Sequence, residues 1–281
     1  MHLYTLATLA CVLGTFPLTC ESAESSESHR YRRQKSNSAC NGYKELCDKS
    51  YADVAYLTTH NSYAYTKGVA SNQNKNINDQ LNDGVRALML DLQKSSNNET
   101  GTDGIHFCHS SCSVMDAGTA QEVLQVITDF MERNPNEVIT IIFENGGQFS
   151  ASDIISVFQA AGLDKYAWEQ SANEQTWPKL QDMIDQNKRL VVFSTDVEQT
   201  QWLLPEFTYV WETPWEVQIG SDFGCQVDRP SAAPYGALQV MNHFAYKSQQ
   251  IASMSFQTAD VDQISQTNSL NSLQDQHRQC E

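Results

Sequence analysis

Short apolar runs alternate with amphipathic stretches along most of this chain. The run Val138–Phe143 is apolar on both faces, which is typical of a parallel strand buried on both sides. Just before it, Thr119–Arg133 places its apolar side chains on one helical face, and Asn134-Pro135 ends that helix. The repeated strand-then-helix order predicts an α/β fold, built either as a barrel or as an open parallel sheet.

The chain is expected to form one domain with a polar tail. Its 281 residues suit a single large α/β domain, and no internal repeat indicates a second one. We place the folded domain at residues 38–250 and expect residues 251–281, rich in Ser, Gln, Asn and Asp, to be a loop held by Cys280. The other expected elements are strands at Arg189–Ser194, Thr208–Glu212 and Ala237–His243 and helices at Ser152–Ala161 and Trp177–Asn187.

The first 22 residues are typical of a secretory signal peptide. Leu6–Leu18 is apolar, too short to span a bilayer, and followed by polar residues. Residues 23–37 are expected to be a disordered leader or propeptide. The basic cluster Arg30–Arg33 within them is either a processing site or a solvated basic patch. The sequence thus predicts a secreted, extracellular protein.

The cysteines agree with an oxidising compartment. Of the eight, Cys11 and Cys20 lie in the signal segment, so six remain. An even number in a secreted chain favours disulfides. Local spacing predicts the pairs Cys40–Cys47 and Cys108–Cys112, which leaves Cys225–Cys280. The alternative is a metal site that uses Cys108, His109 and Cys112.

The net charge of −16 argues against nucleic acid as a partner and is compatible with a bound cation. Nucleic acid is not an expected partner, because its binding requires a basic surface. Bulk attraction to an anionic membrane is not expected either, so we predict only transient contact with a membrane surface. An acidic chain is compatible with a bound divalent cation. We expect a monomer.

Polar side chains follow four of the apolar runs. These are His60, Asp91, His109 and Glu144. In a barrel, functional groups lie at the C-terminal ends of the strands. Two histidines could take a proton from an attacking hydroxyl and return one to a leaving oxygen, as cleavage of a phosphodiester requires. By itself, the pattern fits a hydrogen-bonded polar rim equally well.

Four motifs together resemble the X-domain of phosphatidylinositol-specific phospholipases C, and more closely the secreted fungal-type branch of PLC-like phosphodiesterases. The motifs are Thr59-His60-Asn61-Ser62, Gln80–Asp91, Phe107-Cys108-His109 and Asn134–Ile139. The resemblance implies a single distorted TIM-type (β/α) barrel. It also implies a phosphoric diester hydrolase that cleaves a phosphoinositol lipid or a related phosphodiester, in which the inositol 2-hydroxyl attacks phosphorus.

The same resemblance assigns roles to the two histidines. His60 matches the first catalytic histidine, which stabilises the phosphorane or accepts the proton of the nucleophile. His109 matches the second, which protonates the leaving oxygen. The late segment with Asn242 and His243 is expected to bind substrate, although a structural hydrogen bond is the favoured alternative for His243.

The resemblance also bears on a cofactor. Metal-free bacterial members of the family carry an arginine two residues after the matching aspartate, where this chain has Gln93. Asn61, Asp91 and Glu144 match three of the four ligands of the calcium-dependent members. Met89 stands at the fourth position, and a thioether is a poor ligand for a hard cation. The expectation is a divalent cation, Ca²⁺, held by the three matching residues.

Two other functions remain open. One is a different metal-dependent phosphodiesterase, such as a sphingomyelinase D-like enzyme or a glycerophosphodiesterase. The other is a catalytically silent barrel that binds a lipid headgroup or a glycan, which the methionine at position 89 supports.

Overall fold

The computed structural model describes residues 39–280, apart from residues 66–69, 96, 98, 110, 173, 219, 252–253 and 260–261. The expected signal peptide and leader, with their basic cluster, lie outside the described residues. The sequence Asn98-Glu99-Thr100 matches an N-glycosylation sequon, and its Asn98 also lies outside the described residues. None of the helices in the described ranges is both long and apolar enough to cross a bilayer.

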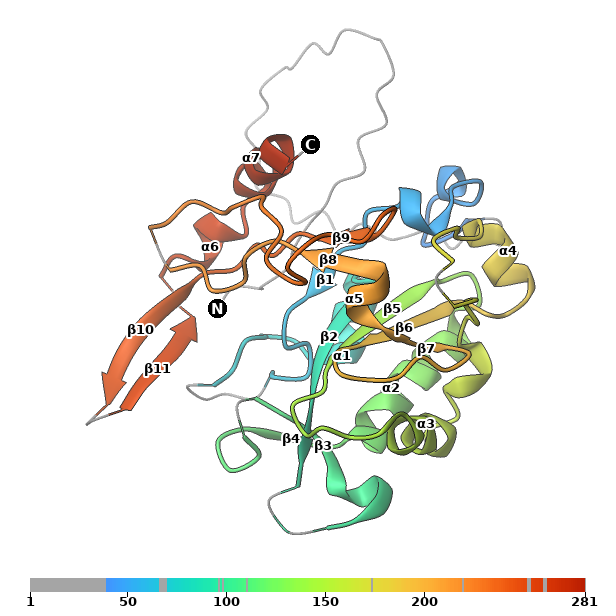
Figure 1. Ribbon diagram of the computed structural model, residues 1–281, viewed down its shortest axis with the longest axis horizontal. Coiled ribbons are helices and arrows are strands. Elements are labelled where there is room, and N and C mark those ends of the chain that lie inside the picture. Colours follow the sequence, from blue (N-terminus) through green and yellow to red (C-terminus); the bar gives the residue numbers. More distant parts are fainter. Residues whose placement is uncertain are drawn as a thin grey trace, which may run out of the picture.

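A mixed sheet of seven strands forms the centre of the molecule (Figure 1). Its strands are β1 (Thr58–Thr59), β2 (Ala87–Lys94), β3 (Ile105–Cys108), β4 (Asp116–Thr119), β5 (Ile139–Glu144), β6 (Leu190–Ser194) and β7 (Leu203–Pro205). The order is β4-β3-β2-β5-β6-β7, with β1 also paired to β2. β1, β2, β5, β6 and β7 run parallel, whereas β3 and β4 extend the sheet in antiparallel pairs.

The other described strands form two smaller sheets. β8 (Val210–Glu212) pairs in parallel with β9 (Leu238–Val240), and β10 (Tyr246–Ile251) forms a hairpin with β11 (Met254–Ala259). Among the described residues, no strand pairing joins β7 to β8 or β9 to β1. The α/β class is therefore confirmed, while closure of the sheet into a barrel stays a prediction.

Within the described ranges, the helical elements are seven α-helices and four short 3-10 turns. The α-helices are α1 (Ile77–Asp83), α2 (Ala120–Arg133), α3 (Ala151–Ala160), α4 (Leu180–Asp185), α5 (Glu206–Tyr209), α6 (Ile264–Thr267) and α7 (Leu270–Cys280); the 3-10 turns are η1 (Lys44–Leu46), η2 (Tyr51–Asp53), η3 (Gly101–Gly104) and η4 (Asp164–Tyr166). α2 begins where its sequence predicts, because Thr119 and Glu122 form a capping box at its N-terminus.

The core lies on both faces of the parallel strands. Ile141 and Phe143 of β5 pack into the layer that also contains residues of α1, α2 and α3. The alternate side chain Ile142 packs into a second cluster with Trp177 and Phe193. Burial on both faces explains why β5 is apolar throughout, as the sequence predicted.

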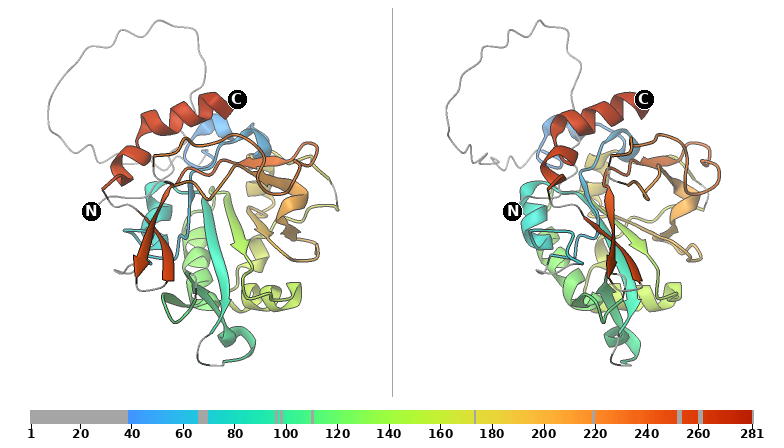
Figure 2. Two further views of the ribbon diagram at one scale, coloured as in Figure 1. Left: turned by 60° about the vertical axis from the view of Figure 1, so that its left-hand side comes forward. Right: turned by 90° about the vertical axis from the view of Figure 1, so that its left-hand side faces the viewer.

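Two expectations about the elements are wrong. The C-terminal segment is not a loop, because it forms β11, α6 and α7. α7 lies at the opposite end of the molecule from β3 and β4 (Figures 1 and 2) and buries Leu273 and Gln276. Asp91 does not end its strand either, because β2 continues to Lys94 through its pairing with β3.

All three predicted disulfides are present. They join Cys40 to Cys47, Cys108 to Cys112, and Cys225 to Cys280. The alternative metal site at Cys108 and Cys112 is thereby excluded, since both sulfur atoms are bonded to each other.

Candidate active site

A cavity of about 300 Å³ opens beside the parallel strands, and six of the predicted site residues line it. They are His60, Asn61, Asp91, His109, Glu144 and Asn242. His243 does not line the cavity. It is fully buried and contacts Gln276 Oε1 and the Thr267 carbonyl oxygen, which favours the structural alternative over contact with substrate.

His60 follows β1 and stacks on Phe244, with ring centroids 4.0 Å apart. Its Nε2 lies 3.0 Å from Asn61 Nδ2 and 3.2 Å from Tyr246 Oη. An amide nitrogen can only donate, so Nε2 accepts and the ring proton sits on Nδ1. Burial, together with the nearby charge of His109, lowers the pKa of His60 to about 3. The ring is therefore neutral and presents a lone pair at Nε2.

Side-chain amides fix the backbone around His60. Asn61 adopts a left-handed conformation (φ 47°), which asparagine tolerates better than most residues. Its Nδ2 also donates to Asn72 Oδ1 at 3.0 Å, so both amide hydrogens are engaged and its Oδ1 is the atom left to accept. Gln73 Nε2 donates to the His60 carbonyl at 2.6 Å.

His109 follows β3 and carries its ring proton on the same nitrogen, Nδ1, as His60. Its Nδ1 lies 2.8 Å from the Ala70 carbonyl oxygen, which can only accept. Nδ1 therefore carries a proton, and Nε2 is the atom that can exchange one. The Cys108–Cys112 disulfide flanks this histidine and ties the segment that follows β3.

Two carboxylates face each other across neighbouring strands. Asp91 of β2 and Glu144 of β5 are register partners in the parallel ladder, so their side chains leave the same face. Burial raises the pKa of Asp91 to about 7, and the charge of Glu144 adds to the rise. The nearby Tyr63 hydroxyl partly opposes this rise in the pKa of Asp91. By the distance and angle criteria for a hydrogen bond, that hydroxyl has no partner among the described residues.

Arg229 brings to this cavity a positive charge that was not expected from the sequence. Arg229 lines it and contacts Glu212 through Nε at 3.0 Å and Nη2 at 2.9 Å. Its Nη1 lies 3.2 Å from Glu144 Oε2. Burial opposes the charge, but the carboxylates of Glu212 and Glu144 outweigh this effect and raise the pKa of Arg229.

Local backbone contacts place this arginine. The Arg229 carbonyl accepts from the Glu212 amide at 2.8 Å, and the Asp228 amide donates to the Glu212 carbonyl at 2.9 Å, so the segment lies against β8. One signal in the sequence could have pointed to it, because Arg229 is the only Lys or Arg between Arg189 and Lys247. The sequence around Arg229 does not indicate which acid it contacts, however, because its partner Glu212 is identified only by the position of β8.

A second buried acid, Glu206, lies beside Glu212. Glu206 and Glu212 are both buried and both line the cavity. Burial and the neighbouring Glu212 raise the pKa of Glu206 well above its ordinary range. Of these two acids, Glu212 is the one that contacts Arg229, through Nε and Nη2.

The three expected cation ligands reach one cavity, but they do not form a complete cation site. Glu144 is engaged by the Arg229 guanidinium, which would repel a metal ion beside it. Met89 lines the same cavity and contributes no oxygen. Within the described residues, the close group of three His, Cys or acidic side chains lies elsewhere, on β3 and β4. The side chains as placed therefore do not fit the Ca²⁺ ion that the sequence predicts.

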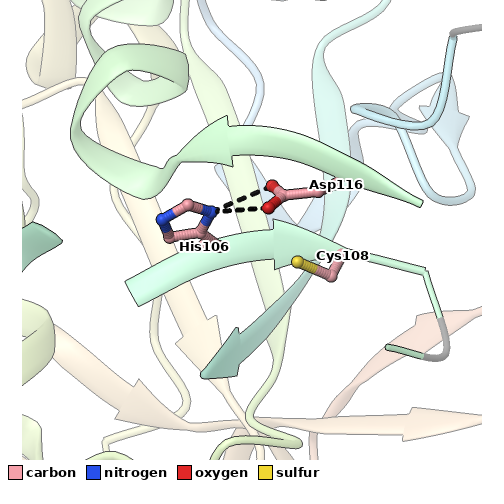
Figure 3. A group of neighbouring side chains, drawn as sticks. All are labelled: His106, Cys108 and Asp116. Carbon is pink, nitrogen blue, oxygen red and sulfur yellow. Dashed lines mark hydrogen bonds and ion pairs between the residues drawn. The ribbon is translucent and has the colours of Figure 1, made fainter. Parts of the chain in front are cut away.

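The group on β3 and β4 is structural (Figure 3). His106 Nδ1 lies 2.9 and 3.0 Å from the two carboxylate oxygens of Asp116 on the neighbouring strand. Cys108, the third member, is bonded to Cys112 and cannot ligate a metal. The pair of His106 and Asp116 joins two strands rather than forming a metal centre.

Comparisons with known proteins agree with the motifs. The family model for PI-PLC X matches residues 46–281. PI-PLC X domain-containing protein 1 of Arthroderma benhamiae is 31% identical over 212 residues, which cover 73% of this chain and 68% of that protein. An uncharacterized secreted protein of the same fungus is 34% identical over 216 residues, or 74% of this chain and 47% of the relative. This chain thus spans about half the length of that relative.

A solved structure is similar in outline. Phosphatidylinositol-specific phospholipase C from Listeria monocytogenes matches with a TM-score of 0.45 and 15% sequence identity, over 60% of this chain and 64% of that one. This likeness is too small to carry a functional argument. The family assignment depends on sequence alone. The match to the family model and the 31% identity to the fungal relative confirm the resemblance of the motifs, and the chain belongs to the PI-PLC X family.

Proposed function

We propose that this protein is a secreted phosphoric diester hydrolase of the phosphatidylinositol-specific phospholipase C type. The observation that carries the proposal is the pair of histidines on one cavity, each with its proton position set by its neighbours. Both rings hold a proton on Nδ1 and exchange one at Nε2, His60 as the neutral ring that accepts it and His109 as the protonated ring that delivers it. One group accepts a proton and the other can deliver one, as general acid–base catalysis needs.

The proposed reaction divides the proton transfers between these groups. His60 Nε2 accepts the proton of the inositol 2-hydroxyl as its oxygen forms a bond to phosphorus. The bond from phosphorus to the glycerol oxygen breaks, and a protonated His109 Nε2 supplies the proton that this leaving oxygen needs. The products are diacylglycerol and a cyclic inositol phosphate. An anionic phosphate in the cavity raises the low pKa of His60 toward the range in which it works as a base.

The decisive experiment offers phosphatidylinositol vesicles to the wild type and to His60→Ala and His109→Ala, with release of cyclic inositol phosphate as the readout. Each variant is expected to lose at least about 100-fold in rate. His277→Ala, which changes an exposed histidine of α7, is the control and is expected to keep the wild-type rate. Thermal unfolding checks that all three variants fold.

The alternatives predict other outcomes of the same assay. Turnover of sphingomyelin or glycerophosphodiesters without phosphatidylinositol would favour another phosphodiesterase. Headgroup binding without turnover under any metal condition would favour a silent barrel. A wild-type rate in His109→Ala would overturn the proposed acid–base roles.

The setting of the reaction is part of the proposal. Three disulfides and a relative named as a secreted protein support an extracellular location. The net charge of −16 supports brief contact with a membrane surface rather than stable binding to anionic lipid. We propose a monomer, which light scattering of the purified protein would check.

A further inference from the structure

Arg229 is the one Lys or Arg among the described residues that line the cavity. Its guanidinium lies between two carboxylates of different character. Glu212 is fully buried and close, at 2.9 Å from Nη2, whereas the Glu144 side chain is about half exposed and lies 3.2 Å from Nη1. The contact with Glu212 therefore anchors the arginine, and the contact with Glu144 is the one that a ligand can displace.

The guanidinium keeps donors for such a ligand. It has five N–H groups, of which Glu212 engages one on Nε and one on Nη2, and Glu144 engages one on Nη1. One N–H on each terminal nitrogen remains. Two N–H groups on a planar fork match two oxygens of a phosphate group.

Cleavage of a phosphodiester needs a positive charge at this place. Negative charge accumulates on the non-bridging oxygens in the transition state and must be stabilised by a cation or by strong donors. Gln93 lines the same cavity but is neutral, and Met89 offers no ligand to a metal ion. Arg229 already holds the position beside Glu144 that the calcium-dependent arrangement would require for the ion.

We propose that Arg229 supplies the charge in place of a metal ion, binding the non-bridging oxygens of the substrate phosphodiester while Glu212 positions its guanidinium. This inference rests on the proposed function and makes the reaction independent of Ca²⁺. Arg229 is then a catalytic residue, because it touches the phosphate, and Glu212 is a positioning residue that acts through it. The substrate phosphate replaces Glu144 as the partner of Nη1, and the contact between Arg229 and Glu212 is kept.

The first test measures binding without turnover. Calorimetry with myo-inositol 1-phosphate in EGTA is expected to show binding to the wild type, and Arg229→Gln is expected to weaken it at least about tenfold. Arg229→Lys, which keeps the charge but not the fork, is expected to fall between them. Arg278→Gln removes an exposed arginine of α7 and is the control for net charge.

The same titration with CaCl₂ tests the metal directly. The wild type is expected to show no heat of Ca²⁺ binding and no shift in Tm up to millimolar concentration. Ca²⁺ binding to the wild type that disappears in Glu144→Gln would overturn the inference. Equal binding of inositol phosphate by the wild type and Arg229→Gln would overturn it as well.

Turnover separates this inference from the proposed function. We expect phosphatidylinositol cleavage that persists in EGTA, falls at least about 100-fold in Arg229→Gln and is partly restored there by added guanidinium ion. Cleavage that requires Ca²⁺ would overturn the inference and leave the hydrolase intact. Arg229-dependent binding of inositol phosphate without any turnover would reject the hydrolase and support the assignment of the charge.

Removing Arg229 leaves Glu212 buried with an unpaired charge, which destabilises the fold. The double variant Arg229→Gln/Glu212→Gln removes both charges and is expected to recover stability but not binding of inositol phosphate. Recovery of binding in this double variant would contradict a direct contact between Arg229 and the phosphate.

Discussion

His106 shows how a histidine outside the cavity contributes to stability. Its Nδ1 faces Asp116 at 2.9 Å, and its Nε2 lies 3.1 Å from the Asp103 carbonyl oxygen and 3.3 Å from Glu99. Burial opposes its protonation, but Asp116 outweighs this effect and the pKa of His106 is raised. Because the pKa of His106 is higher in the folded than in the unfolded chain, its charge stabilises the fold. This stabilisation is fully present below about pH 6.5 and is lost as the pH rises through the folded pKa.

The variant His106→Gln tests this dependence. We expect it to lower the free energy of unfolding at pH 5.5 by about 2 kcal/mol, the contribution of a hydrogen bond to a charged group, and by less at pH 9. Urea unfolding at both pH values is the measurement, with the exposed His277→Gln as the control. An equal loss at both pH values would show that the charge of His106 plays no part.

Individual residues of the site could be predicted only where a local motif surrounds them. His60, Asn61 and Asp91 lie in motifs that are contiguous in the sequence, and each lines the cavity. Arg229 comes from a polar segment without periodicity, and its function follows from the position of β8. His243 lies beside a lining residue in sequence, but its burial against Gln276 follows from α7.

At the scale of single elements, Arg189 joins the end of α2 to the start of β6. Its Nη2 donates to the Met131 carbonyl at 2.8 Å, and its Nη1 donates to the carbonyls of Asn134 and Glu137 at 3.2 and 3.1 Å. Carbonyl groups at the C-terminal end of a helix lack partners within the helix, so this arginine satisfies buried acceptors.

Arg189→Met keeps the packing volume and removes these donors. We expect the free energy of unfolding to fall by about 3 kcal/mol, roughly 1 kcal/mol for each hydrogen bond, as measured by denaturant titration. Arg278→Met, at an exposed position of α7, is expected to change it by less than about 0.5 kcal/mol. A loss of similar size in both variants would point to a general effect of the substitution.

Elements with strong periodicity were predictable, and those defined by distant partners were not. The two apolar faces of Val138–Phe143 gave the buried strand β5 because both layers of the core contact it. The direction of β3 was not predictable, since it depends on pairing with the far half of β2. α7 was not predicted from the sequence, because its composition is polar and only two of its residues, Leu273 and Gln276, are buried.

At the scale of the whole molecule, the Cys225–Cys280 disulfide ties α7 to the segment after β8. It closes a loop with a separation of 55 residues, compared with 7 for Cys40–Cys47. Loop-closure entropy assigns about 4 kcal/mol to the long loop and about 2.5 kcal/mol to the short one. α7 also contacts the site, because Gln276 Nε2 donates to the Asn242 carbonyl at 3.1 Å.

We therefore expect Cys225→Ser/Cys280→Ser to lose more stability than Cys40→Ser/Cys47→Ser in urea unfolding. It should also bind inositol phosphate more weakly, because Asn242 loses its support from α7. Stability lost without any change in binding would show that α7 does not support the cavity.

The position of α7 also has a consequence for how the protein is made. A chain folds progressively from its N-terminus during synthesis, so the parallel strands can assemble before α7 emerges. Gln276 and Cys280 emerge only after those strands; Gln276 then donates to the carbonyl of the lining residue Asn242, and Cys280 forms the disulfide to Cys225. We therefore expect the support of Asn242 to form only after residue 280 has been synthesised and the disulfide to Cys225 has closed.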